Sequence, residues 1–201
     1  MITATQMLGS VDNAPRPSQT EATDVANAIF DGTDAIMLSE ETAIGKYPVQ
    51  AVKMLAKIAR EAEDKLPYEQ ILSERGRWLE HKTDEMISYS ACHTAHSLGA
   101  AALVAFTQSG STAGRVSKYR PKMPILAITP DAVVGGRLML RWGVYPFQTA
   151  GALSVDELLT TAAKLSKELG LAKPGDLIVI TGGIPVGVAG STNLLRVEKV
   201  Q

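Results

Sequence analysis

Two short apolar runs, residues 1–8 and 34–38, flank one helix-like segment at the N-terminal end of the chain, and each run breaks into a polar turn. Ser18 and Glu21, three positions apart, form a capping-box pattern that predicts the start of this helix. Gly32 provides its stop. The pattern therefore predicts a strand–helix–strand unit. In parallel α/β folds, ligands and chemistry collect at the carboxyl ends of the strands.

A second helix is predicted from Pro48 to about Glu63, because proline fits the first turn of a helix. Apolar residues recur at helical spacing and give this helix one apolar face: Val49, Val52, Leu55, Ala56 and Ala59. Residues 64–82 are mixed and charged, and we interpret them as a connector that is partly helical.

From about residue 83 the pattern alternates between helices and strands. The expected helices are 84–98, 112–118, 131–141 and 155–169, and the expected strands are 101–106, 124–129, 144–148, 177–181 and 194–199. Such alternation implies a mostly parallel sheet that is covered on both faces. No helix precedes the last strand, so this strand is a candidate for antiparallel pairing.

The composition narrows the class of protein. The chain has 20 Lys and Arg against 21 Asp and Glu, which leaves no basic face for nucleic acid. The longest apolar stretch is too short to span a bilayer. The N-terminus lacks a basic segment followed by an apolar one, and a single cysteine, Cys92, fits a reducing compartment. We therefore expect a cytoplasmic protein that contacts neither membranes nor nucleic acid.

Three polar side chains follow the first two apolar runs: Thr5 at the end of the first, and Ser39 and Glu41 at the end of the second. If the two strands are neighbours, these groups meet at one rim. Hydroxyls there can position water or relay a proton, and a carboxylate can accept one. The alternative is that Thr5 caps a helix and Ser39 fills a turn.

A second candidate site is the segment Thr107, Gln108, Ser109, Gly110, Ser111 and Thr112, which lies between a predicted strand and a predicted helix. Hydroxyls, a flexible glycine and free N–H groups at a helix start can form a cradle for phosphate. Many strand–helix loops share this pattern, and the lysine spacing of a nucleotide P-loop is absent. The nearby bases Arg115, Lys118 and Arg120 fit a solvated helix face equally well.

His93 and His96 lie three apart on a predicted helix, a spacing that can bind a metal. No third ligand is evident, so we interpret them as packing or polar-face residues. Cys92 is expected to be a small buried residue, and Trp78 and Trp142 are expected to be packing anchors.

Seven strings of the sequence together resemble the pyruvate kinase family. They are residues 2–8 (ITATQML), 15–17 (PRP), 24–28 (DVANA), 36–43 (IMLSEETA), 47–48 (YP), 117–121 (SKYRP) and 190–194 (GSTNL). Their order is that of the family, and they extend over essentially the whole chain. One departure is Glu40, where the family usually has a small residue; its side chain can point to solvent or repel a phosphate, and we favour the first.

The resemblance implies a fold and a domain division. Residues 1–63 would be the last two strand–helix units of the family's (β/α)8 barrel, 64–82 a connector, and 83–201 the C-terminal domain, a mostly parallel three-layer α/β/α fold. The family uses the C-terminal domain to bind an effector and to form tetramers, so a homo-oligomer is implied.

The resemblance also implies roles for the candidate residues. The position of Thr5 lies beside the methyl carbon of the enolpyruvate and takes part in its protonation, and Ser39 and Glu41 belong to the adjoining polar network. Thr107, Ser109, Gly110, Ser111 and Thr112 match the loop that binds a phosphate of a sugar-phosphate or nucleotide effector. The glycine-rich loop 182–193 packs beside it.

Two functional hypotheses follow. In the first, the chain is the last part of a pyruvate kinase that acts on phosphoenolpyruvate and ADP with Mg²⁺ and K⁺. The metal-binding carboxylates and the lysine of that family lie outside this chain, so the isolated chain is expected to be inactive. In the second, the chain is a non-catalytic module that binds a phosphate effector and assembles into oligomers.

Overall fold

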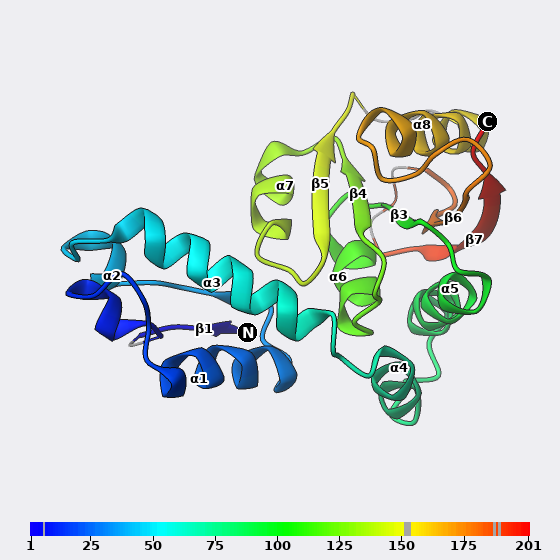
Figure 1. Ribbon diagram of the computed structural model, residues 1–201. Coiled ribbons are helices and arrows are strands. Elements are labelled where there is room, and N and C mark those ends of the chain that lie inside the picture. Colours follow the sequence, from blue (N-terminus) through cyan, green and yellow to red (C-terminus); the bar gives the residue numbers. More distant parts are fainter. Residues whose placement is uncertain (6, 151–153, 187, 189) are drawn as a thin grey trace. The chain divides into compact units, whose positions relative to one another are not determined.

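The computed structural model describes residues 1–5, 7–150, 154–186, 188 and 190–201 and divides into two compact units, Met1–Pro67 and Tyr68–Gln201 (Figure 1). The boundary predicted from the sequence, a connector over 64–82, stays a prediction. Helix α4 (Tyr68–Gly76) lies within that connector and belongs to the second unit. In the described part of the chain, no helix combines the length and apolarity that crossing a membrane requires.

In its described residues, the first unit contains a pair of short parallel strands, three α-helices and one 3-10 helix. Its elements are β1 (Ile2–Thr3), the 3-10 helix η1 (Gly9–Asp12), α1 (Gln19–Phe30), β2 (Ala35–Ile36), α2 (Glu40–Ala43) and α3 (Pro48–Glu63). Ile2 pairs with Ala35 and Thr3 with Ile36. The predicted helices are confirmed. Both strands are shorter than the apolar runs that predicted them. After β1, the backbone leaves the extended conformation at Thr5, whose φ is 70°.

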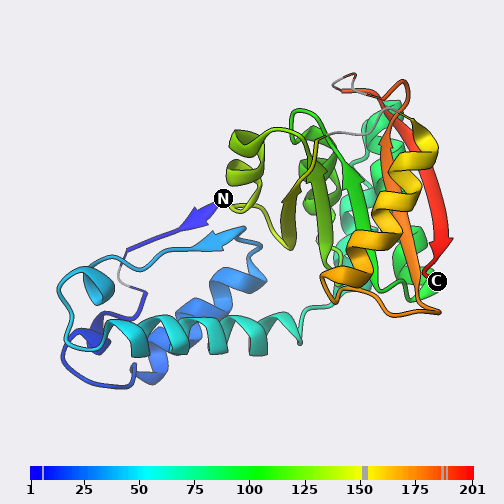
Figure 2. The same ribbon diagram turned by 90° about the horizontal axis from the view of Figure 1, so that it is seen from above.

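The core of this unit lies between the strands and the two long helices. Its buried residues come from α1, α3 and the segment after β1: Met7, Leu8, Val11, Val25, Ala28 and Ala51. Figure 2 shows α1 and α3 on the same side of the strand pair. Ile2 is 50% exposed, so the strand pair has an uncovered apolar side chain.

The start of α1 is stabilised by the predicted capping box. The side chain of Ser18 accepts from the N–H of Glu21, and the Glu21 carboxylate accepts from the Ser18 N–H at 2.7 Å. The same carboxylate accepts from the N–H of Ser10 at 2.7 Å. Burial works to raise the pKa of Glu21, but the hydrogen bonds from Ser10 and Ser18 outweigh it and lower the pKa from 4.5 to about 2.

We expect Glu21→Gln to remove a pH-dependent part of the stability of the first unit. The folded pKa lies below the unfolded one, so the ionised side chain stabilises the fold above pH 4.5, and this contribution is lost as the pH falls towards about 2. The variant should be less stable than the parent at neutral pH. Its free energy of unfolding should also change less than the parent's between pH 4.5 and about 2. Urea unfolding followed at the α1 amides by NMR measures both effects. If the stability of the parent and that of Glu21→Gln changed with pH in the same way, the prediction would be wrong.

The second unit is a five-stranded sheet with helices on both faces. After α4 come α5 (Thr83–Leu98), β3 (Ala102–Phe106), α6 (Ser111–Lys118), β4 (Ile125–Thr129), α7 (Ala132–Leu138), β5 (Val144–Gln148), α8 (Val155–Glu168), β6 (Leu177–Gly183) and β7 (Thr192–Lys199). The strand order is β5-β4-β3-β6-β7. All pairs are parallel except β6 with β7, so the antiparallel pairing of the last strand is confirmed.

Side chains alternate between the two faces of the sheet, as the strand period of two requires. Leu103 and Ala105 of β3 join a core with α5, α6 and α7, whereas Ala102 and Val104 join a core with α8. Figure 2 shows α8 alone in front of the sheet and the other helices of this unit behind it. The predicted three-layer α/β/α arrangement is confirmed.

Candidate functional site

The three residues predicted at the strand ends of the first unit line one hollow. Thr5 reaches it from the segment after β1, and Ser39 and Glu41 reach it from the start of α2. Gly9, Asp12 and Glu40 complete the lining. The parallel pairing of β1 with β2 brings the two carboxyl ends together, as the sequence predicted. Gly9 and Asp12 were missed, because they follow the strand by several residues and only the turn into η1 returns them to the rim.

Glu41 holds the two strand ends together from a buried position. The residue is 2% exposed. One carboxylate oxygen, Oε1, accepts from the N–H of Leu8 at 3.0 Å, and Oε2 accepts from the N–H of Ser39 at 2.7 Å. The side chain thus bridges the segment after β1 and the segment after β2.

Glu41 is an anion in the folded protein. Burial works to raise the pKa of Glu41, but hydrogen bonds from backbone N–H groups, those of Leu8 and Ser39 foremost, outweigh it and lower the pKa below its ordinary value. Both oxygens therefore act as acceptors that position backbone.

Thr5 has a backbone conformation that side chains branched at Cβ rarely adopt. Its φ is 70°, in the left-handed region. Strain of this kind persists where the surrounding structure imposes it, and it gathers at functional sites. The residue is exposed, and its hydroxyl donates to the carbonyl of Ala4 at 2.6 Å.

Ser39 and Glu40 begin α2. Ser39 occupies the N-cap position, yet its side chain makes no capping hydrogen bond. Within the described residues its hydroxyl has no hydrogen-bond partner, so it is available to the hollow. The adjacent Glu40 is exposed and also lines the hollow, so the expectation that it does not repel a phosphate stays a prediction.

A second hollow lies at the carboxyl ends of the strands of the larger sheet. It is lined by Thr107, Ser111 and Thr112 of the predicted phosphate loop and by the loop after β6, including Ser191 and Thr192. The side chains of the described lining residues carry no formal charge. Thr149, which follows β5, also lines the hollow and was missed. The rule that ligands gather at strand ends could have found it.

The hydroxyls of this hollow differ in their hydrogen bonding. Thr112 Oγ1 and Thr192 Oγ1 lie 2.7 Å apart and satisfy each other. Thr107 is 7% exposed, and its buried Oγ1 has no partner in the described part of the structure. A buried hydroxyl without a partner costs free energy, so a ligand oxygen at this point would be stabilised.

The predicted phosphate loop borders two hollows. Thr107 and Thr112 line the neutral one, Ser109 and Gly110 line a groove between α6 and α7, and Ser111 lines both. Gly110 has φ 87° and is the N-cap of α6 without a side-chain hydrogen bond, so the first-turn N–H groups of α6 lack a side-chain acceptor.

The remaining candidate residues have mostly structural environments. Cys92 is 1% exposed, and burial raises the pKa of its thiol. Trp142 is buried beneath Arg120, whose guanidinium carbon lies 4.8 Å from the ring centroid. Trp78 is 86% exposed, contrary to the expected packing role, because it follows the end of α4.

The structure also bears on metal binding. His93 and His96 are both exposed on α5. Across the described residues, no group of three or more His, Cys, Asp or Glu side chains could hold a metal ion.

Two protein-family models match the chain. The model described as pyruvate kinase, barrel domain, matches residues 1–52, and the model described as pyruvate kinase, alpha/beta domain, matches residues 85–198. Together with the parallel strand pair and the larger sheet, these matches confirm the predicted fold class, a barrel remnant followed by an α/β/α domain.

Individual relatives agree with the family models. The chain is 48% identical over 201 residues to pyruvate kinase of Clostridium acetobutylicum and 50% identical over 200 residues to that of Geobacillus stearothermophilus. It spans 42% and 34% of those proteins, respectively. A crystal structure of a pyruvate kinase from Cryptosporidium parvum aligns with a TM-score of 0.92 and 32% identity, covering the whole of this chain and 40% of that one.

Proposed function

Since this chain belongs to the pyruvate kinase family, we propose that it supplies the last part of an enzyme that transfers the phosphoryl group of phosphoenolpyruvate to ADP, producing pyruvate and ATP in glycolysis. The observation that carries the proposal is the hollow that joins Thr5, Ser39 and Glu41 at the carboxyl ends of β1 and β2. In barrel enzymes, this end of the strands is where the chemistry takes place.

Thr5 is the residue we assign to chemistry. After phosphoryl transfer, the enolpyruvate must gain a proton at its methylene carbon to become pyruvate. The exposed Thr5 hydroxyl lines the hollow and is aimed by a strained backbone, which suits a group that relays this proton. Ser39 adds to the relay a hydroxyl that has no partner in the described part of the chain, and Glu41 positions both strand ends.

The charged machinery of phosphoryl transfer is assigned to other residues of the complete enzyme. Transfer needs concentrated positive charge on the moving group. Magnesium and potassium ions would supply it, with a lysine, from barrel strands that precede this part of the sequence in the relatives. The described residues do not fit a metal site, so no step is assigned to a metal held by this chain.

The isolated chain should therefore not turn over phosphoenolpyruvate and ADP. We expect activity from a chimera in which this chain replaces the matching 42% of the Clostridium acetobutylicum relative. A coupled assay with purified proteins, Mg²⁺ and K⁺ tests both expectations. A folded chimera without activity, or an isolated chain whose activity survives repurification, would contradict the proposal.

The hollow in the second unit is assigned to a regulatory ligand. The proposal is that Thr107, Ser111 and Thr112 contact a phosphate of a sugar-phosphate or nucleotide effector, with Ser109 and Gly110 shaping the loop. The unpaired hydroxyl of Thr107 supports it, and so does the start of α6, where N–H groups and the helix dipole favour an anion. The effector would act by binding one arrangement of a homotetramer more tightly.

Thr107→Val tests the regulatory proposal, because it removes the hydroxyl while keeping the shape. Calorimetry with a panel of sugar phosphates and nucleoside monophosphates should find a ligand that binds the parent chain. The variant should bind this ligand with about tenfold lower affinity, which corresponds to the loss of one hydrogen bond to a charged group. Unchanged affinity would show that this hydroxyl does not contact the ligand.

We also propose a cytoplasmic location, because phosphoenolpyruvate and ADP, the two proposed substrates, are found in the cytoplasm.

A further inference from the structure

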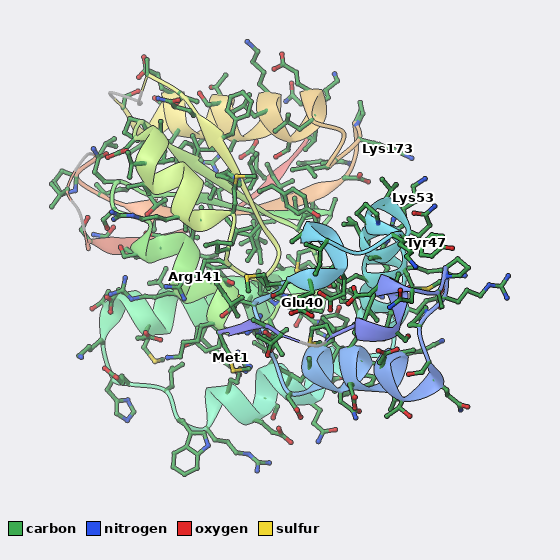
Figure 3. The ribbon with its side chains drawn as sticks, turned by 90° about the vertical axis from the view of Figure 1, so that its left-hand side faces the viewer. Met1, Glu40, Tyr47, Lys53, Arg141 and Lys173 are labelled. Atoms are coloured by element: carbon green, nitrogen blue, oxygen red, sulfur yellow. The ribbon has the colours of Figure 1, made fainter. Side chains whose placement is uncertain are left out.

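A groove between α6 and α7 of the second unit has an unusual concentration of positive charge. Four cationic side chains line it: Arg115 and Lys118 on α6, Arg137 on α7, and Arg141 just beyond α7. Arg141 is labelled in Figure 3. The lining residues include no carboxylate. The groove is separated from the neutral hollow by the loop before α6, and Ser111 is the residue that lines both.

Two of the four cations are held in place by acidic residues at the start of α5. Arg115 Nη2 lies 2.6 Å from Asp84 Oδ2, and Lys118 Nζ lies 3.1 Å from Glu85 Oε2. These pairs neutralise two charges and restrict both side chains. The other guanidinium nitrogen of Arg115, Nη1, is buried and has no hydrogen-bond partner among the described residues. It is therefore a donor that still lacks an acceptor.

The other two cations leave the groove with an excess of positive charge. Arg137 and Arg141 are exposed, and neither forms an ion pair with any residue that the structure describes. Four cations against the carboxylates of Asp84 and Glu85 leave an excess of two charges. An arginine stays ionised throughout the physiological pH range, so this excess is permanent.

The neutral parts of the groove also suit an anion. Ser109 and Ser111 provide hydroxyls at one end, beside the start of α6, which has no side-chain cap. Val134 and Leu138 supply apolar surface. A Cβ built on Gly114 would meet nothing within 4 Å, so this side of α6 faces open space.

We propose that this groove is a binding site for a phosphorylated small molecule that carries at least two negative charges, separate from the site in the neutral hollow. Phosphoryl oxygens match the donors present, since guanidinium groups bind them in bidentate fashion and helix starts and hydroxyls complete the coordination. The two sites share Ser111 and the start of α6, but the groove proposal rests on the four cationic side chains and not on a ligand in the neutral hollow.

The test uses the full chain and two inorganic probes, pyrophosphate and tripolyphosphate. Calorimetry at low ionic strength should detect binding that weakens as salt is added. NMR of the labelled chain should show the largest shifts at residues 114–118 and 134–141, which lie outside the lining of the neutral hollow. Largest shifts in the loop after β6 would place the anion in the neutral hollow and overturn the proposal, as would the absence of binding.

Two double variants distinguish binding in the groove from non-specific attraction by the net positive charge of the surface. R137Q/R141Q should lower the affinity for tripolyphosphate by about tenfold or more, since each arginine contributes charge-assisted hydrogen bonds. K164Q/K173Q removes the same charge from exposed lysines outside the groove lining and should bind like the parent. Equal affinity of the two double variants would overturn the assignment.

Gly114→Leu tests the groove by filling it without changing charge. The added side chain meets open space, and leucine favours a helix more than glycine does, so α6 should remain folded. Binding of tripolyphosphate should fall by about tenfold or more. A Gly114→Leu variant that binds as well as the parent would overturn the proposal, and so would a groove that binds polyglutamate but neither phosphate probe.

Discussion

Replacing Glu41 with alanine should abolish the folded structure around the two strand ends of the first unit. The change leaves the buried N–H groups of Leu8 and Ser39 without an acceptor. Each such group costs about 1–3 kcal/mol, and more where the lost partner was charged. The first unit has two strands of two residues each, so its free energy of unfolding is expected to be too small to offset this loss.

Hydrogen exchange resolved by segment measures this effect. Protection should disappear at residues 7–11 and 39–44 in Glu41→Ala, while β3 and β6 of the second unit stay protected and serve as an internal reference. Glu40→Ala is the matched control, because the neighbouring carboxylate is exposed and makes no such bridge. Equal protection in Glu41→Ala and Glu40→Ala would show that the bridge contributes little.

Thr5→Ala should slow turnover in the complete chimeric enzyme by about 10²–10⁴, the range typical of a positioned proton-transfer group. The KM for phosphoenolpyruvate should change much less, because the proposed role concerns the proton and not substrate binding. The rate at which the methyl hydrogens of pyruvate exchange with D₂O isolates this step and should fall in parallel with kcat.

Thr5→Ser separates the hydroxyl from the backbone strain. It keeps the hydroxyl and removes the branch at Cβ that is strained at φ 70°. The serine variant should recover most of the exchange rate that alanine loses. If alanine and serine are equally slow, or if alanine leaves kcat unchanged, Thr5 has only a structural role.

Much of the fold could be predicted because local chemistry and packing agree in this chain. The capping box predicted at Ser18 is present, a second one starts α8 at Ser154, and Pro48 begins α3. The continuous apolar runs along β3 and β6 match a sheet covered on both faces. Antiparallel pairing of β7 followed from the absence of a helix before it.

The candidate sites were less predictable, because their form depends on groups far apart in sequence. The sequence placed Thr5, Ser39 and Glu41 at one rim, but the hydrogen bonds of Glu41 to backbone depend on how two loops approach each other. The split of the 107–112 loop between two hollows depends on where α7 lies relative to α6. Neither has a local sequence signal.

The order of strands in the larger sheet has a consequence for how the chain folds during synthesis. β3 lies at the centre, yet one of its two neighbours, β6, comes more than 70 residues later in the sequence. Until that segment leaves the ribosome, β3 has one edge without hydrogen-bond partners, and its apolar side chains lack part of their cover. Closing so long a loop also slows pairing. The nascent domain should therefore depend on chaperones until β6 emerges and inserts beside β3.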